Sequence, residues 1–230
     1  MRWLAIVMML WLGAAQRVQA DPLNILFIGD SITQGGRNDR NEWTYRVPLQ
    51  ALIDVTGIAV AYIGTRDRGL DPQATWPPGF DPHHEAYYGA RTAEVRDRLQ
   101  DHLPVLAPPD IALIHLGTND HDADFVAPLE QIVGMLRARN PHVVVLLGQV
   151  HSGGLRSVWG RMQVDRLAAR IGTESSPVVP VRFDGWVADP HEPDADTYDG
   201  VHPNPKGQSA MALAWFAALR PYLRSLDGLV

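Results

Sequence analysis

One stretch near the start of the chain, residues 24–36, constrains the fold more than any other. It opens on the apolar run Ile25-Leu26-Phe27-Ile28, which ends at Gly29 and is followed at once by Asp30 and Ser31. A continuous apolar run that ends at glycine is typical of a strand buried on both faces of a parallel sheet. Open parallel sheets form their binding sites at the carboxyl ends of the strands, so Ser31 is a candidate nucleophile.

Downstream of this strand, short apolar runs alternate with segments in which apolar residues recur at helical spacing. The expected strands are 24–28, 58–63, 111–116, 143–150 and 178–183, and the expected helices are 45–55, 92–103, 124–139, 158–171 and 205–223. Regular alternation of this kind predicts a parallel sheet with helices on both faces. We expect an α/β fold, a three-layer α/β/α sandwich with a five-stranded parallel sheet. In its flavodoxin-like order the first and third strands are neighbours.

The first 20 residues have the pattern of a secretory signal peptide. Arg2 precedes a short apolar run, and Val18-x-Ala20 stands just before Asp21, so cleavage is expected after Ala20. The alternative is an uncleaved membrane anchor, but the run is shorter than the ~20 residues that a spanning helix needs. The rest of the chain, residues 21–230, is expected to form one domain that acts in the periplasm or the external medium.

Cysteine content and charge narrow the function classes. The chain has no cysteine, which excludes disulfides, thiolate metal sites and a cysteine nucleophile. Its formal net charge of −6 at pH 7 argues against nucleic acid or an anionic membrane as partner. Neither a phosphate-binding P-loop nor a dinucleotide fingerprint follows any expected strand. His83, His84 and Glu85 are adjacent, and sequence neighbours rarely point at one ion, so we predict no metal site.

Two later motifs contain what a nucleophilic serine needs. Gly117-Thr118-Asn119-Asp120 follows the third expected strand, and the Asn119 amide there can donate to a developing oxyanion. Asp199 precedes His202 by three residues, so its carboxylate can hold Nδ1 and leave Nε2 to take a proton from serine. Taken alone, the first motif is a turn and the second a surface loop before a helix.

Together the motifs resemble those of the SGNH (GDSL) hydrolase superfamily. The matching blocks are Gly29-Asp30-Ser31-Ile32, Gly117-Thr118-Asn119-Asp120 and Asp199-x-x-His202, with Gly89 as the best match to the glycine of the family's second block. Further similarity to the acetylxylan-esterase-like branch of carbohydrate esterases lies in Tyr45-Arg46-x-Pro48-Leu49, Tyr62-Ile63-Gly64 and His84-Glu85.

The resemblance implies ester hydrolysis on a three-layer α/β/α fold, without metal or cofactor. It implies that Ser31 is the nucleophile and that His202 is the base, oriented by Asp199. It further implies an oxyanion hole made of the Ser31 and Gly89 backbone N–H groups and the Asn119 side chain.

The function predicted on this basis is an exported serine esterase that removes acetyl groups from a carbohydrate or another small ester. The loops lack a long apolar stretch that would hold a long acyl chain. Asp30, Trp43 and Trp76 are candidate substrate contacts, although each tryptophan could instead pack its own loop. Two alternatives stay open: a lysophospholipase or thioesterase of the same superfamily, and a non-catalytic glycan-binding domain. After signal cleavage no stable membrane association is expected.

Overall fold

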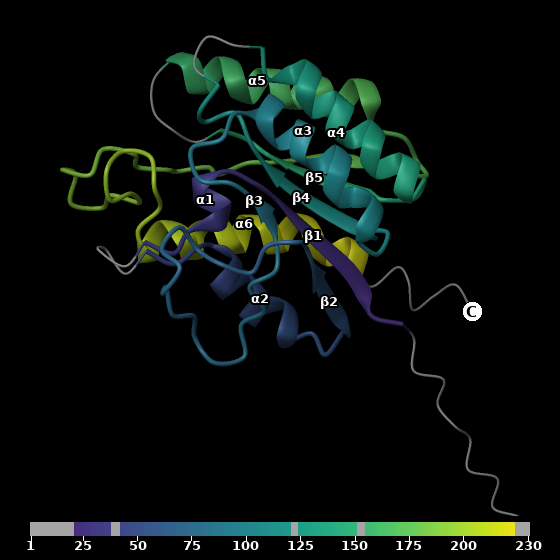
Figure 1. Ribbon diagram of the computed structural model, residues 1–230. Helices are drawn as coiled ribbons and strands as arrows, with labels where there is room; N and C mark the ends of the chain where they lie inside the picture. The colour runs from purple at the N-terminus through teal and green to yellow at the C-terminus, as the bar shows by residue number, and fades with distance from the viewer. Residues whose placement is uncertain (1–20, 38–41, 121–123, 151–154, 224–230) are drawn as a thin grey trace, which may run out of the picture.

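A parallel sheet between two layers of helices organises the structure, a computed structural model that describes residues 21–37, 42–120, 124–150 and 155–223 (Figure 1). The strands are β1 (Leu23–Gly29), β2 (Val60–Ile63), β3 (Glu85–Ala86), β4 (Ile111–His115), β5 (Val144–Gly148) and β6 (Val178–Val181). The helices are α1 (Ser31–Gln34), α2 (Arg46–Asp54), α3 (Thr92–His102), α4 (Val126–Arg139), α5 (Leu155–Ile171) and α6 (Pro205–Leu223), with a 3₁₀ turn at Leu103–Val105.

The sheet has the strand order β2-β1-β4-β5-β6, and every pairing in it is parallel. β1 and β4 are therefore neighbours, with Gly29 opposite His115 at their carboxyl ends. The predicted adjacency of the first and third apolar runs is confirmed. As a result, the segments that follow β1 and β4 leave the sheet side by side.

The prediction of five strands misses β3, which has only two residues. β3 pairs with β1 at Ile28 and Gly29, directly beyond the stretch of β1 that β2 covers. Its two residues lie inside the proline-rich segment 65–89, where no hydrophobic period marks a strand. The pairing brings the chain after β3, including Gly89, to the same edge of the sheet as Ser31.

Alternating side chains of β1 enter two separate cores. Leu26 and Ile28 pack with residues of α3, α4 and α5, whereas Ile25 and Phe27 pack with residues of α2 and α6. Each of these four side chains is fully buried, which contributes roughly 1.5–3 kcal/mol apiece. The strand is held rigidly from both faces, so the turn that follows it is held as well.

No helix in the described part of the chain is long and apolar enough to cross a membrane. The segment 1–20, expected to be a signal peptide, lies outside the described residues.

Candidate active site

Ser31 is the first residue of α1, a single helical turn at the carboxyl end of β1 (Figure 1). Asp30 caps this turn, since its Oδ1 accepts a hydrogen bond from the Ile32 N–H at 3.0 Å. The turn ends at Gly35, whose N–H donates to the Ser31 carbonyl at 2.8 Å and whose φ is 60°. A side chain at Gly35 would collide with the Trp43 carbonyl, so glycine is needed there.

His202 meets Ser31 across 171 positions of sequence, with 3.0 Å between its Nε2 and the Ser31 Oγ. On the other side of the ring, Nδ1 lies 2.9 Å from Oδ2 of Asp199. A carboxylate opposite Nδ1 favours the tautomer with the proton on Nδ1, so Nε2 is the nitrogen that accepts the hydrogen bond from Ser31. The three side chains predicted to act together are brought together.

A tight turn just before α6 positions His202. The Asp199 Oδ1 accepts hydrogen bonds from the N–H groups of Val201 (3.2 Å) and His202 (2.8 Å), which fixes the carboxylate beside Nδ1. Gly200 has a φ of 86°, a conformation that glycine adopts without strain. Asn204 then accepts from the Gly207 N–H at 3.0 Å and caps α6. The turn that carries His202 is therefore held by hydrogen bonds of Asp199 before it and of Asn204 after it.

Three hydrogen-bond donors stand at the same edge of the sheet. Among the described residues, neither the Ser31 N–H nor the Gly89 N–H has an acceptor. The Asn119 Nδ2 donates one of its two hydrogens to the Ala90 carbonyl at 3.0 Å, and the second remains for another acceptor. Donors arranged in this way can stabilise an oxyanion formed on a carbonyl carbon that Ser31 attacks.

Asp120 fixes the spacing between two of these donors. Its carboxylate accepts from the Thr92 N–H at 3.1 and 3.2 Å and from the Thr92 Oγ1 at 2.8 Å. Thr92 begins α3, so a negative charge lies at the positive end of that helix. Together with the Asn119–Ala90 bond, this contact holds the turn after β4 against the segment that carries Gly89.

Asp30 lies behind Ser31 and has no exposed surface. The pKa of its carboxyl is raised to about 7, chiefly by burial and to a smaller extent by the charge of Asp120. Hydrogen bonding from the Ile32 N–H acts in the opposite direction. As a candidate substrate contact Asp30 gains no support, because its carboxyl is enclosed by protein and faces α1.

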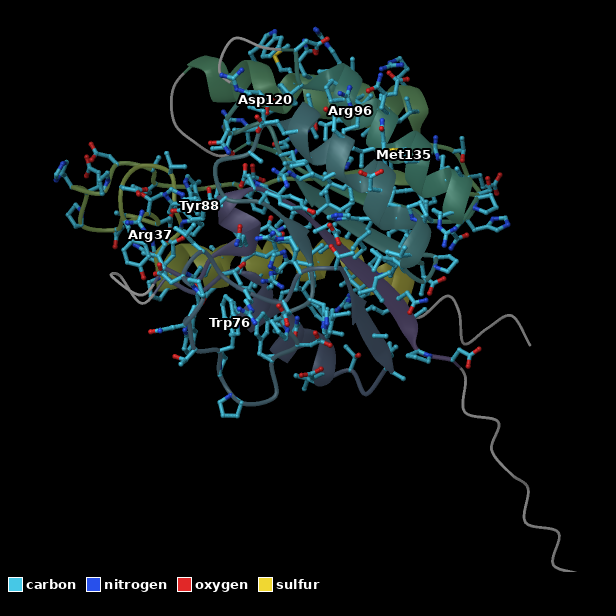
Figure 2. All side chains as sticks on the ribbon, viewed as in Figure 1. Arg37, Trp76, Tyr88, Arg96, Asp120 and Met135 are labelled. Carbon is cyan, nitrogen blue, oxygen red and sulfur yellow. The ribbon has the colours of Figure 1, made fainter. Side chains whose placement is uncertain are left out.

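The two candidate tryptophans have different surroundings. Trp76 packs on Phe80, with ring centroids 5.2 Å apart, and on the guanidinium of Arg46 at 6.0 Å. It lies on the α2 side, apart from Tyr88 (Figure 2), and these contacts are with its own loop and with α2. Trp43 is 43% exposed and remains a candidate contact.

His84 is a structural residue, as its contacts show. Its Nε2 donates to the Arg68 carbonyl at 3.0 Å, and its Nδ1 accepts from the Ala86 N–H at 2.9 Å. Burial lowers the pKa of this imidazole well below its usual range, so the ring is neutral. Both ring nitrogens are used within the protein.

Sequence reasoning missed Tyr88, whose ring stacks on the imidazole of His202 with a centroid separation of 5.4 Å and an interplanar angle of 14°. It also missed Gln34, whose Oε1 accepts from the Tyr88 N–H at 2.7 Å. The only available signal was position, since Tyr88 directly precedes Gly89 and Gln34 lies one helical turn after Ser31.

Comparisons with known proteins agree with this architecture. A model described as the GDSL-like Lipase/Acylhydrolase family matches residues 27–210. No curated protein matches the chain. Among solved structures, an acetyl esterase mutant with acetate ion is 22% identical, covering 89% of this chain and 99% of that one, with a TM-score of 0.72.

Two family 3 carbohydrate esterases have the same fold. The one from Talaromyces cellulolyticus is 24% identical, covers 88% of this chain and 98% of its own, and has a TM-score of 0.72. The one from Clostridium thermocellum is 18% identical, covers 90% and 100%, and has a TM-score of 0.73. These structures share the three-layer architecture of this chain over almost their whole length, which confirms the predicted fold.

Proposed function

This chain belongs to the GDSL-like lipase/acylhydrolase family, and from that premise we propose that it removes acetyl or similarly short acyl groups from carbohydrates. Membership in the family makes it a carboxylic ester hydrolase. The finer assignment has two parts, the residues that carry out the hydrolysis and the ester that is cleaved. Each part is supported by a different set of side chains.

In the proposed mechanism Ser31 Oγ attacks the ester carbonyl carbon while His202 Nε2 takes the hydroxyl proton. The oxygen that becomes negative accepts hydrogen bonds from the Ser31 N–H, the Gly89 N–H and the Asn119 side chain. The alcohol leaves with the proton from His202, and the acyl group remains on Ser31. Water then attacks this ester as His202 takes one of its protons, and His202 gives that proton to Ser31 Oγ as the acid is released.

One observation carries this mechanism: Ser31 Oγ, both nitrogens of His202 and Asp199 lie in a continuous line of hydrogen bonds at 3.0 and 2.9 Å. A glycan-binding module would need contacts to sugar hydroxyls but would have no use for this proton path. The arrangement therefore favours an enzyme over the alternative of a non-catalytic binding domain.

Polar and aromatic side chains around Ser31 support a short acyl group on a sugar. Arg37 and Tyr88 lie together (Figure 2), Tyr88 stacks on His202, and the exposed ring of Trp43 follows in the same loop as Arg37. Aromatic faces and charged donors suit a sugar better than a long hydrocarbon chain. Three of the similar solved structures are named as acetyl or carbohydrate esterases, which agrees with this choice.

The first test compares acyl chain lengths and natural polymers. We expect p-nitrophenyl acetate to be hydrolysed faster than the butyrate and much faster than the decanoate. Acetate release should be detectable from acetylated xylan, acetylated pectin fragments or simple acetylated sugars. Faster cleavage of the decanoate would instead support the lysophospholipase or thioesterase alternative.

The second test removes the nucleophile. Ser31→Ala should lower kcat by about 10⁴-fold or more, because the remaining site offers only binding and oxyanion stabilisation. Ser209→Ala is the matched control, since Ser209 is exposed on α6. Turnover that survives in Ser31→Ala would remove Ser31 from its role, and glycan binding without any turnover would point to the binding-domain alternative.

A further inference from the structure

His202 has a third neighbour besides Ser31 and Asp199, and this is the ring of Tyr88. The two rings are almost parallel, at 14°, with centroids 5.4 Å apart, the geometry of an offset stack. Tyr88 is half-buried and belongs to the segment after β3, whereas His202 belongs to the turn before α6. The stack therefore joins the segment that holds Gly89 to the segment that holds the base.

The hydrogen bonds of His202 act on the edge of its ring and not on its faces. Nδ1 bonds to Asp199 and Nε2 bonds to Ser31, and these two contacts lie on opposite sides of the ring. They hold the two nitrogens in place but give no support to either face of the ring. A flat side chain against one face does give that support, and Tyr88 occupies that position.

Tyr88 is itself held at both ends. Its backbone N–H donates to Oε1 of Gln34 at 2.7 Å, and its hydroxyl accepts from Nη1 of Arg37 at 3.4 Å. The orientation of the Gln34 amide is set in turn, because its Nε2 donates to the Arg68 carbonyl at 3.4 Å. Gln34 is buried and Tyr88 is half-buried, so the contact between them is partly shielded from solvent.

These contacts connect the two ends of α1 through Tyr88 and His202. Ser31 begins α1 and Gln34 is its last residue, one turn further along the same helix. Gln34 binds Tyr88, Tyr88 stacks on His202, and His202 meets Ser31. The helix that presents the nucleophile thus also anchors the side chain that orients the base.

We infer that Tyr88 is a positioning residue, which holds the imidazole plane of His202 so that Nε2 faces Ser31 during acylation and deacylation. The inference rests on the proposed esterase function. Because His202 takes a proton in both steps, misplacement of its ring slows both. Tyr88 acts through the face of its ring, so an aromatic ring without a hydroxyl can replace it.

Two substitutions test this role. Tyr88→Leu removes the flat face but keeps an apolar side chain, and it should lower kcat for p-nitrophenyl acetate by roughly 3- to 10-fold with KM little changed. Tyr88→Phe keeps the ring and should restore kcat to within about twofold of the unmodified chain. Tyr222→Leu is a control, because Tyr222 lies in the last turn of α6, at the opposite end of that helix from His202.

A measurement without substrate distinguishes a change in the orientation of the His202 ring from partial unfolding of the variant. In carbon–proton NMR spectra, the imidazole protons of His202 should show a ring-current shift from the Tyr88 ring. That shift should persist in Tyr88→Phe and disappear in Tyr88→Leu, while urea unfolding verifies that each variant is folded.

Three outcomes would overturn the inference. They are an unchanged kcat in a folded Tyr88→Leu variant, a Tyr88→Phe variant as slow as Tyr88→Leu, and a change confined to KM, which would indicate a substrate contact. Failure of the proposed function looks different, because the unmodified chain would then show no turnover that depends on Ser31.

Discussion

Asp30 caps the helix that carries Ser31 and is at the same time a buried carboxyl. Its carboxyl caps α1 and thereby sets the direction of Ser31, yet it has no exposed surface. Burial raises its pKa to about 7, far above the value of 3.8 for an unperturbed aspartate. The carboxyl is therefore largely protonated in mild acid, whereas at alkaline pH the protein holds a buried negative charge directly behind Ser31.

Because of this burial, the contribution of Asp30 to stability falls as pH rises, whereas that of an aspartate with a lowered pKa increases with pH. The folded state binds the proton of Asp30 more tightly than the unfolded state, so its contribution to stability is fully present below pH 3.8 and is lost as pH rises through about 7. Asp30→Asn cannot titrate, but its Oδ1 can still accept from Ile32. From pH 5 to pH 8, its unfolding free energy relative to the unmodified chain should rise by roughly 2–3 kcal/mol.

Urea unfolding at the two pH values measures this difference. Asp101→Asn, on the exposed side of α3, is the control, and its difference from the unmodified chain should not change with pH by more than about 0.5 kcal/mol. If Asp30→Asn behaved like Asp101→Asn, the carboxyl would have an ordinary pKa and the burial argument would be wrong.

At the scale of the elements, Arg46 ties α1 to the loop 65–89. It is the first residue of α2, fully buried, and its guanidinium donates to four backbone carbonyls. Two belong to α1, Thr33 at 2.8 Å and Gln34 at 3.4 Å, and two to the loop, Pro82 at 2.8 Å and His83 at 3.2 Å. A planar group with five donors is suited to a junction of this kind.

Replacing this arginine should loosen the junction. Arg46→Met fills similar space but leaves four carbonyls without their donor, so we expect destabilisation of about 3 kcal/mol in urea unfolding. The stability of Arg46→Lys should lie between that of the unmodified chain and that of Arg46→Met. An ammonium keeps the charge, but it has fewer donors than a guanidinium and is not planar. Arg166→Met, exposed on α5, is the control and should change stability by less than about 0.5 kcal/mol. A comparable loss in both methionine variants would contradict the role of the junction.

The elements differ in how far sequence could predict them. The main strands are apolar runs and the longer helices are periodic, so both classes follow from the residues that form them. β3 has neither signal, because it exists only where β2 stops short and leaves the last residues of β1 without a partner on that side. Segments whose structure depends on a vacant edge of this kind carry no pattern of their own.

The same distinction applies to the site. Ser31, Asn119 and His202 stand in short motifs and were predicted to act together. Tyr88 and Gln34 belong to no motif, and their contacts arise only after segments distant in sequence have packed at one edge of the sheet. Motifs identify the reacting groups, whereas the side chains that orient them follow from the folded arrangement.

At the scale of the whole molecule, segments from very different parts of the chain lie together at the carboxyl ends of the strands. The turns after β1, β3 and β4 and the long loop before α6 all reach these ends, and that loop projects from the α1 end of the sheet (Figure 1). The opposite end of the sheet holds the start of β1, the first strand of the described residues. The boundary between the expected signal peptide and the domain therefore lies far from Ser31.

The position of that boundary makes a prediction about processing. We propose that export removes residues 1–20, so the mass of the exported protein should correspond to a chain that begins at Asp21. β1 begins at Leu23, whose N–H donates to the Ala59 carbonyl at 2.9 Å, and the Asn24 N–H donates to Asp110 at 2.9 Å. A chain produced from Asp21 keeps both bonds and should retain full kcat.

A chain that begins at Ile25 is the informative comparison. It loses both hydrogen bonds and the buried side chain of Leu23, so its unfolding free energy should fall by about 2–4 kcal/mol relative to the chain from Asp21. Its active site should stay intact in the molecules that remain folded, because the lost residues lie at the far end of β1 from Ser31. An exported protein that retains residues 1–20 would show instead that the segment is kept, and would favour the membrane-anchor alternative.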